Sequence, residues 1–149
     1  GATKNGAMAA EAIVVINPDV VEGMLYLRKF TMQLASKMRF ISAQLQALFD
    51  NELGIRSATH ANTMAKLLRS SLEQKISDGE ISGLEFSQPT EANGVFAVMP
   101  NAAADALREH VAFYDWDRAR GEVRWMCSFD TTEDDINRFV DQIAAVLPG

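Results

Sequence analysis

The sequence has few of the residues from which disulfides and metal sites are built. It contains one cysteine, Cys127, and two histidines, His60 and His110, among 149 residues. A lone cysteine cannot form a disulfide within the chain, so a reducing compartment fits best and we expect a cytoplasmic protein. The three side chains also lack the paired spacing of zinc ligands, so we expect no metal site.

Basic charge and long apolar runs are equally scarce. Twenty acidic side chains against fourteen basic ones give a net charge of -6, which argues against nucleic acid as a partner. The longest apolar stretches, such as residues 12–16, fall far short of the ~20 residues that a membrane-spanning helix requires. The start of the sequence also lacks the basic and apolar segments of a secretory signal. We therefore expect no membrane partner.

Motifs that cradle phosphate or activate a serine are missing as well. Neither Gly-x-x-x-x-Gly-Lys-Ser/Thr nor Gly-x-Gly-x-x-Gly occurs, and no Gly-x-Ser-x-Gly marks a nucleophile. What is present is the composition of a globular protein, with 48% hydrophobic and 23% charged residues. The chain can therefore bury a core.

Apolar periodicity predicts how the first half of the chain folds. Residues 12–16 are expected to form a buried strand. A helical pattern runs from residue 20 to residue 50, where Gly23 weakens or bends its first part, and Gly54 is placed to stop the helix. A second helix is expected at residues 59–77, with His60 near its start as a polar or capping residue.

After residue 80 the apolar period changes from helical to alternating. We expect strands at residues 84–86, 95–99, 113–116 and 123–127, and a short helix at residues 102–110. Thr131 or Thr132 caps a last helix, whose buried stripe is Ile136, Phe139, Val140, Ile143 and Leu147. We interpret Trp116, Trp125 and Cys127 as packing residues. The pattern predicts an α/β fold in which helices cover a small sheet.

The sequence begins without methionine, shortly before the expected strand, and we take it to be a piece of a longer protein. Lys4 lies there in the small-residue turn Gly1-Ala2-Thr3-Lys4-Asn5-Gly6. Crowding by backbone and by a planar ligand would desolvate such a lysine and lower its pKa toward the neutral amine that forms Schiff bases. The simpler interpretation is a solvated charge near a chain end.

Four stretches of the sequence resemble one family. Residues 1–15, Gly-Ala-Thr-Lys-Asn-Gly-Ala-Met-Ala-Ala-Glu-Ala-Ile-Val-Val, resemble the cofactor-lysine segment of the low-specificity L-threonine aldolases. The later matches, in order, are residues 27–29 with 33–40, residues 60–62 and residues 123–126. The resemblance implies the C-terminal portion of an aspartate-aminotransferase-like fold, a fold of transferases that depend on pyridoxal 5'-phosphate (PLP). Its helices would pack on a small, mainly antiparallel sheet.

The resemblance also implies roles for single residues. Lys4 matches the lysine that holds PLP covalently, with Thr3 beside it in the cofactor-binding turn. Lys29 and Lys37 lie where relatives carry basic residues that reach the cofactor phosphate or the substrate region from a neighbouring subunit. On an exposed helix face, a basic pair of this kind is otherwise ordinary.

Arg124 matches the arginine that grips the α-carboxylate of the substrate. A guanidinium suits this task because it offers two parallel charge-assisted hydrogen bonds to a planar anion. Without the resemblance, a structural salt bridge to Glu122 or Asp130 would be the simpler role.

As a whole, the resemblance implies a PLP-dependent lyase of amino acid metabolism, in the β-eliminating lyase branch. It would cleave threonine-like β-hydroxy-α-amino acids to glycine and an aldehyde, as a homodimer or homotetramer. Residues 1–19 would be the cofactor-lysine loop and the last strand of the large domain, residues 20–54 connecting helices, and residues 55–149 the small C-terminal α/β domain. The catalytic groups of the upstream part are missing, so we expect this fragment alone to be inactive.

Two other interpretations stay open. The chain could be a non-enzymatic α/β module whose helices serve dimerisation, with Lys4 merely terminal. It could also belong to another PLP enzyme of the same fold, such as an aminotransferase or a β-eliminating lyase.

Overall fold

Four strands form one antiparallel sheet in the order β1-β2-β4-β3. The computed structural model describes all 149 residues and divides into two compact units, Gly1–Arg56 and Ser57–Gly149. The strands all lie in the second unit; they are β1 (Glu85–Phe86), β2 (Gly94–Val98), β3 (Tyr114–Asp117) and β4 (Glu122–Met126). Each lies within one residue of its predicted position.

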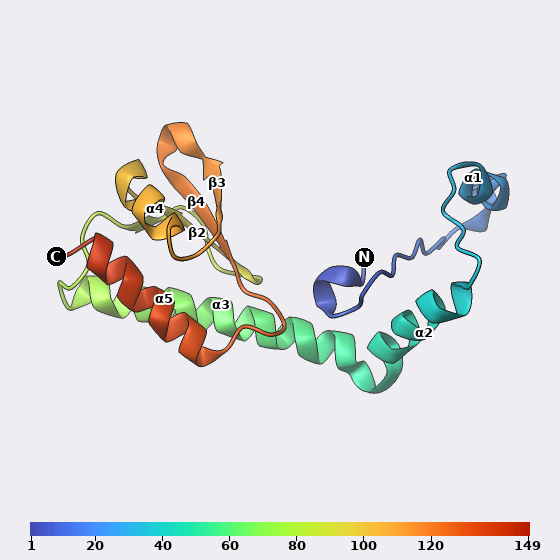
Figure 1. The fold of residues 1–149 in the computed structure, drawn as a ribbon, viewed down its shortest axis with the longest axis horizontal. Coiled ribbons are helices and arrows are strands. Elements are labelled where there is room, and N and C mark those ends of the chain that lie inside the picture. Colours follow the sequence, from blue (N-terminus) through green and yellow to red (C-terminus); the bar gives the residue numbers. More distant parts are fainter. The chain divides into compact units, whose positions relative to one another are not determined.

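Helices cover one face of this sheet. They are α3 (Leu53–Ser77), α4 (Asn101–Arg108) and α5 (Glu133–Val146). Figure 1 shows α3 and α5 side by side, and Lys75 of α3 approaches Asp141 of α5 to 3.7 Å. Leu68 and Leu72 of α3 share a core with Val95, Val123 and Ile143. The predicted fold class, helices packed on a small antiparallel sheet, is confirmed.

Alternation along β4 gives the sheet two different faces. Val123 and Trp125 point toward the helices and are almost completely buried, with exposed fractions of 1% and 3%. Arg124 and Met126 therefore point to the opposite face, which no helix of this unit covers. The pairing register adds Phe96 of β2 and Tyr114 of β3, both directly opposite Arg124.

The start of α5 is fixed by a reciprocal cap. The Thr132 hydroxyl accepts a hydrogen bond from the Asp135 amide at 3.1 Å, and the Asp135 carboxylate accepts one from the Thr132 amide at 3.0 Å. Thr132 is thus the capping residue, rather than Thr131. The predicted stripe is buried at Ile136, Val140, Ile143 and Leu147, and partly buried at Phe139.

The first unit contains two short helices, α1 (Met24–Phe30) and α2 (Met38–Phe49). One helical pattern was predicted from residue 20 to residue 50. This prediction is wrong between Phe30 and Met38, where the chain is not helical. After α1, Met32 adopts a left-handed conformation (φ 59°) that a helix cannot continue. Gly23 (φ 67°) does not bend the helix but precedes it as its cap.

The predicted strand at residues 12–16 does not form. The segment has no partner strand, and Ile13, Val14 and Ile16 are at least 79% exposed. A strand needs a neighbour to satisfy its backbone N–H and C=O groups, and within this chain none is available to it.

Two further predictions about α3 are corrected. The helix begins at Leu53, not at residue 59, so Gly54 lies in its first turn and does not stop it. The break between α2 and α3 comes instead at Asn51 and Glu52, which both have positive φ. His60 consequently lies inside the helix, where its Nε2 makes a 2.7 Å hydrogen bond with the Thr131 carbonyl. None of the helices is both long and apolar enough to cross a bilayer.

Candidate functional site

Lys4 lies in the short 3-10 turn η1 (Thr3–Asn5) of the first unit. The turn is closed by a 3.0 Å hydrogen bond from the Asn5 amide to the Ala2 carbonyl, and Gly6 follows in a left-handed conformation (φ 101°). The side chains of Thr3 and Lys4 are exposed. Within the first unit, no side chain covers that of Lys4.

Side-chain hydrogen bonds join this turn and the residues after it to the helices. Asn5 Nδ2 donates to the Gly54 carbonyl at 2.9 Å. Gln44 Oε1 of α2 accepts from the amides of Met8 and Ala9 at 2.9 and 3.1 Å. Asn5 and Gln44 were not predicted as residues that hold the turn, because a single amide side chain forms no recognisable pattern in a sequence.

The side chain of Lys4 makes no ion pair within this chain. Neither Lys4 nor the two other predicted cofactor-binding lysines, Lys29 and Lys37, takes part in an ion pair. Lys29 lies in α1 and Lys37 immediately precedes α2, both exposed. No hydrogen bond joins the three lysines, so the structure does not connect them directly.

Arg124 lies in the second unit, in the middle of β4, and is partly buried. Its Nε is buried and has no hydrogen-bond partner. The guanidinium carbon lies 5.1 Å from the centre of the Trp116 ring. Arg124 makes no ion pair, so the alternative prediction of a salt bridge to Glu122 or Asp130 is wrong.

Glu122 is buried but is bound elsewhere. It is 4% exposed, and its carboxylate accepts a 2.5 Å hydrogen bond from the Ser87 hydroxyl. It shares the sheet face of Arg124, two residues away, yet it forms no ion pair with the guanidinium. No carboxylate of this chain is therefore bound to the Arg124 guanidinium.

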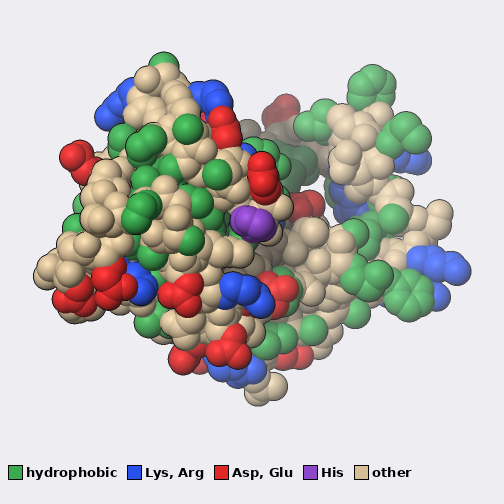
Figure 2. Space-filling view, turned by 60° about the vertical axis from the view of Figure 1, so that its left-hand side comes forward, with side chains coloured by type: hydrophobic (Ala, Val, Ile, Leu, Met, Phe, Trp, Pro, Cys, Tyr) green, Lys and Arg blue, Asp and Glu red, His purple; other side chains and the backbone are tan.

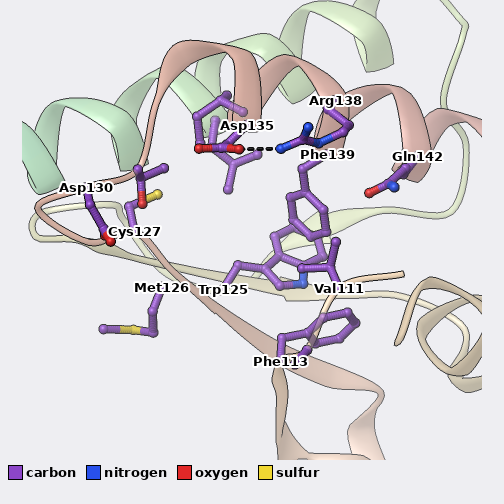
Figure 3. Close-up of a pocket in the computed structure, with 14 residues that line it drawn as sticks. Val111, Phe113, Trp125, Met126, Cys127, Asp130, Asp135, Arg138, Phe139 and Gln142 are labelled. Carbon is purple, nitrogen blue, oxygen red and sulfur yellow. Dashed lines mark hydrogen bonds and ion pairs between the residues drawn. The ribbon is translucent and has the colours of Figure 1, made fainter. Parts of the chain in front are cut away.

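A cavity of about 360 Å³ lies on the other face of β4. Figure 3 shows Trp125, Phe113 and Phe139 on its wall and the Asp135–Arg138 ion pair at its side. Trp125 meets Phe139 edge to face, with ring centres 5.3 Å apart, so this wall is a packed aromatic cluster. Trp125 and Arg124 are consecutive in the strand and point to opposite faces, and Arg124 does not line the cavity.

The chain is similar in sequence to known proteins. No family model matches the chain. It is 40% identical over 148 residues to "Low specificity L-threonine aldolase" of a Pseudomonas species and 36% identical to the protein of the same name from Pseudomonas aeruginosa. These alignments cover 99% of this chain and 41% of each relative, so the chain spans about two-fifths of their length.

A solved structure agrees with the sequence comparison. A threonine aldolase from Leishmania major superposes with a TM-score of 0.74 and 22% sequence identity, over 89% of this chain and 37% of that one. At this identity the likeness shows the fold. The resemblance stated from the sequence is thus confirmed: the chain is similar over nearly its whole length to part of the low-specificity L-threonine aldolases and has the corresponding part of the threonine aldolase fold.

Proposed function

We propose that the chain supplies the cofactor lysine and the carboxylate-binding arginine of a PLP-dependent carbon–carbon lyase. The substrate class is a threonine-like β-hydroxy-α-amino acid, and the products are glycine and an aldehyde. The names of the two Pseudomonas relatives support this reaction. The structural observation that carries the proposal is the guanidinium of Arg124, which has no carboxylate partner and a buried, unpaired Nε.

The residues of the first unit fit the cofactor by their chemistry. Covalent attachment of an aldehyde needs a primary amine without an ion pair, and Lys4 provides one on a hydrogen-bonded turn. Thr3 adds a hydroxyl beside it, and Lys29 and Lys37 supply unpaired positive charge for a phosphate. When bound, PLP accepts the electrons of the broken Cα–Cβ bond.

Arg124 binds and orients the substrate in this proposal. Two N–H groups on one edge of the guanidinium bind the two carboxylate oxygens. This fixes one end of the amino acid, so that the bond to be broken is held in a single orientation. Lys4 would hold the cofactor covalently when no substrate is bound.

The attachment of PLP to Lys4 can be tested chemically. PLP is added to the full-length protein, the adduct is reduced with borohydride, and the labelled peptide is identified by mass spectrometry. The label is expected on Lys4 and is expected to disappear in Lys4→Arg but not in the control variant Lys66→Arg, which changes an exposed lysine of α3. A protein without adduct, or with the label only on another lysine, contradicts the proposal.

Substrate tests separate the lyase from the two alternatives. A lyase releases glycine and acetaldehyde from threonine or allo-threonine, an aminotransferase forms a keto acid from its amino donor, and a β-eliminating lyase releases the β-substituent. A non-enzymatic dimerisation module does none of these. Since the chain spans only part of its relatives, we also propose that these 149 residues alone do not cleave threonine above background.

We also propose a homodimer or homotetramer. Large apolar side chains of the first unit are exposed, including Leu25 and Phe30 of α1 and Phe49 of α2, at 77%, 87% and 79%. Exposed apolar surface of this extent favours association. Figure 2 shows such side chains at the surface among charged ones. Sedimentation of the full-length protein as a monomer would contradict this proposal.

A further inference from the structure

We infer that Trp116 is a positioning residue for Arg124: its indole holds the guanidinium in place without neutralising it, so that its charge stays available to the carboxylate of the substrate. The inference rests on the proposed role of Arg124 in binding substrate. Trp116 was interpreted from the sequence as a packing residue, but it is 54% exposed and lies on the uncovered face of the sheet.

The contact between the two side chains is a cation–π contact over the face of the indole, not an ion pair. The Arg124 guanidinium carbon lies 5.1 Å from the centre of the Trp116 ring, within the range of a cation–π interaction. The N–H groups of a guanidinium lie in its plane and point outward from its edge. A carboxylate partner would occupy some of these donors and neutralise the charge, whereas an aromatic ring leaves the charge in place.

A β-bulge in β3 places Trp116 beside the Arg124 guanidinium. Asp115 of β3 pairs with Val123 of β4, and Asp117 pairs with the adjacent Glu122. Trp116 is therefore an extra residue with no partner on β4. Bulges bend a strand and redirect the side chain of the extra residue, and they are frequent beside functional sites.

A second aromatic residue supports the indole. Phe96 of β2 lies directly opposite Arg124 in the sheet, and its ring meets Trp116 edge to face at 5.2 Å and 83°. The two aromatic residues come from the strands on either side of β4, Phe96 from β2 and Trp116 from β3. An edge-to-face pair of this kind restricts the rotation of both rings.

Tyr114 provides a matched control within the same strand. It lies on the same face as Trp116 and is 76% exposed, and it makes no recorded cation–π contact with Arg124. If the loss of any exposed aromatic residue from β3 affected the protein, Tyr114→Leu and Trp116→Leu should therefore have equal effects.

Kinetics of the full-length protein test the inference. Trp116→Leu is expected to raise the KM for threonine about fivefold or more, since it removes one cation–π contact, and to change kcat less. Trp116→Phe retains an aromatic face and should keep KM close to that of the parent sequence. Tyr114→Leu should leave KM within about twofold of the parent value. In an Arg124→Gln background, Trp116→Leu should have no further effect on KM, because Trp116 acts through the guanidinium.

A second readout does not depend on aldolase activity. In NMR spectra of this chain, the Nε–H resonance of Arg124 should move in Trp116→Leu, which loses the ring current, and stay in place in Tyr114→Leu. Glycine is the carboxylate probe, and it should shift that resonance at lower concentration in the parent sequence than in Trp116→Leu.

The two readouts separate the two proposals. If the full-length protein cleaves no threonine, the proposed function fails, while the NMR titration still decides whether Trp116 positions Arg124 for a carboxylate. If Trp116→Leu matches Tyr114→Leu in KM or in the glycine titration, or if the effect of Trp116→Leu persists in full without Arg124, the inference is overturned.

Discussion

Asn5 donates a 2.9 Å hydrogen bond from its side chain to the backbone carbonyl of Gly54, 49 residues further along the chain. The bond ties the turn that carries Lys4 to the first turn of α3. Space for a side chain at Gly54 is tight, because a Cβ there would lie 3.1 Å from the Leu48 carbonyl oxygen and 3.2 Å from Asn5 Nδ2. The absence of a side chain at Gly54 thus permits the close approach that the bond needs.

Asn5→Ala should loosen the turn. Loss of one partly buried hydrogen bond costs about 1 kcal/mol, so we expect the amides of Asn5 and Ala7 to exchange with solvent about fivefold faster. Both amides donate to the Ala2 carbonyl within the turn. Hydrogen exchange measured by NMR checks this expectation. Asn137→Ala removes an exposed amide that makes no recorded hydrogen bond, and equal acceleration in that variant would show that the Asn5 bond is not responsible.

The second unit could be predicted from the sequence because its apolar patterns are satisfied within the chain. The alternation that predicted β4 buries Val123 and Trp125 against α3 and α5, whose own stripes face them. The first unit was predicted less well for the same physical reason. Residues 12–16 have the composition of a buried strand, but composition cannot supply the neighbouring strand that pairing requires.

The other wrong predictions concern a glycine and a residue in a β-bulge. Gly54 was interpreted as a helix stop, but it lies in the first turn of α3, where the Leu48 carbonyl oxygen comes close to it. Trp116 could not be connected to Arg124 from the sequence, because a bulge breaks the alternation from which strand faces are inferred. Lys4 and Arg124 themselves came from resemblance to a family, since no local pattern distinguishes either from an ordinary surface charge.

Cys127 should react slowly in the folded protein. Burial raises the pKa of its thiol from 9.0 to about 11. The reactive thiolate is therefore about a hundredfold scarcer near pH 7.5 than for an unperturbed thiol, and burial also blocks access. Alkylation by iodoacetamide, followed by mass spectrometry, should be more than about a hundredfold slower in buffer than in urea. Similar rates in the two solvents would mean that the thiol is not buried.

The cap of α5 should make stability depend on acid pH. The Thr132 hydroxyl and amide, and then Arg138, hold the pKa of the Asp135 carboxyl below its ordinary value of 3.8. A lowered folded-state pKa stabilises the fold above the ordinary value, and this contribution is lost as the pH falls through the lower folded value. Asp135→Asn should therefore lower the melting temperature at pH 7, and the difference from the parent sequence should shrink below pH 3.8.

Asp134→Asn is the matched control for the cap. Asp134 lies in the same first turn of α5 but takes no part in the capping box. Both variants lose one negative charge near the positive end of the helix dipole, and only Asp135→Asn also loses the reciprocal bonds. Thermal melts from pH 2.5 to 7 compare the two. Equal losses of stability at pH 7 would show that the dipole, not the cap, accounts for the effect.

Arg124→Lys should weaken substrate binding even though it keeps the positive charge. The lysine ammonium is a point charge without the planar pair of donors, and it is too small to cover the Trp116 ring as the guanidinium does. In the full-length protein we expect the KM for threonine to rise about tenfold or more, with a smaller change in kcat, since one of two charge-assisted bonds is lost. Arg120→Lys is the control, because Arg120 is exposed in the neighbouring turn η4 (Arg118–Arg120) and its side chain makes no recorded contact. If the two variants have the same KM as the parent, the carboxylate is bound by another residue, and Arg124 with its buried, unpaired Nε serves the sheet rather than the substrate.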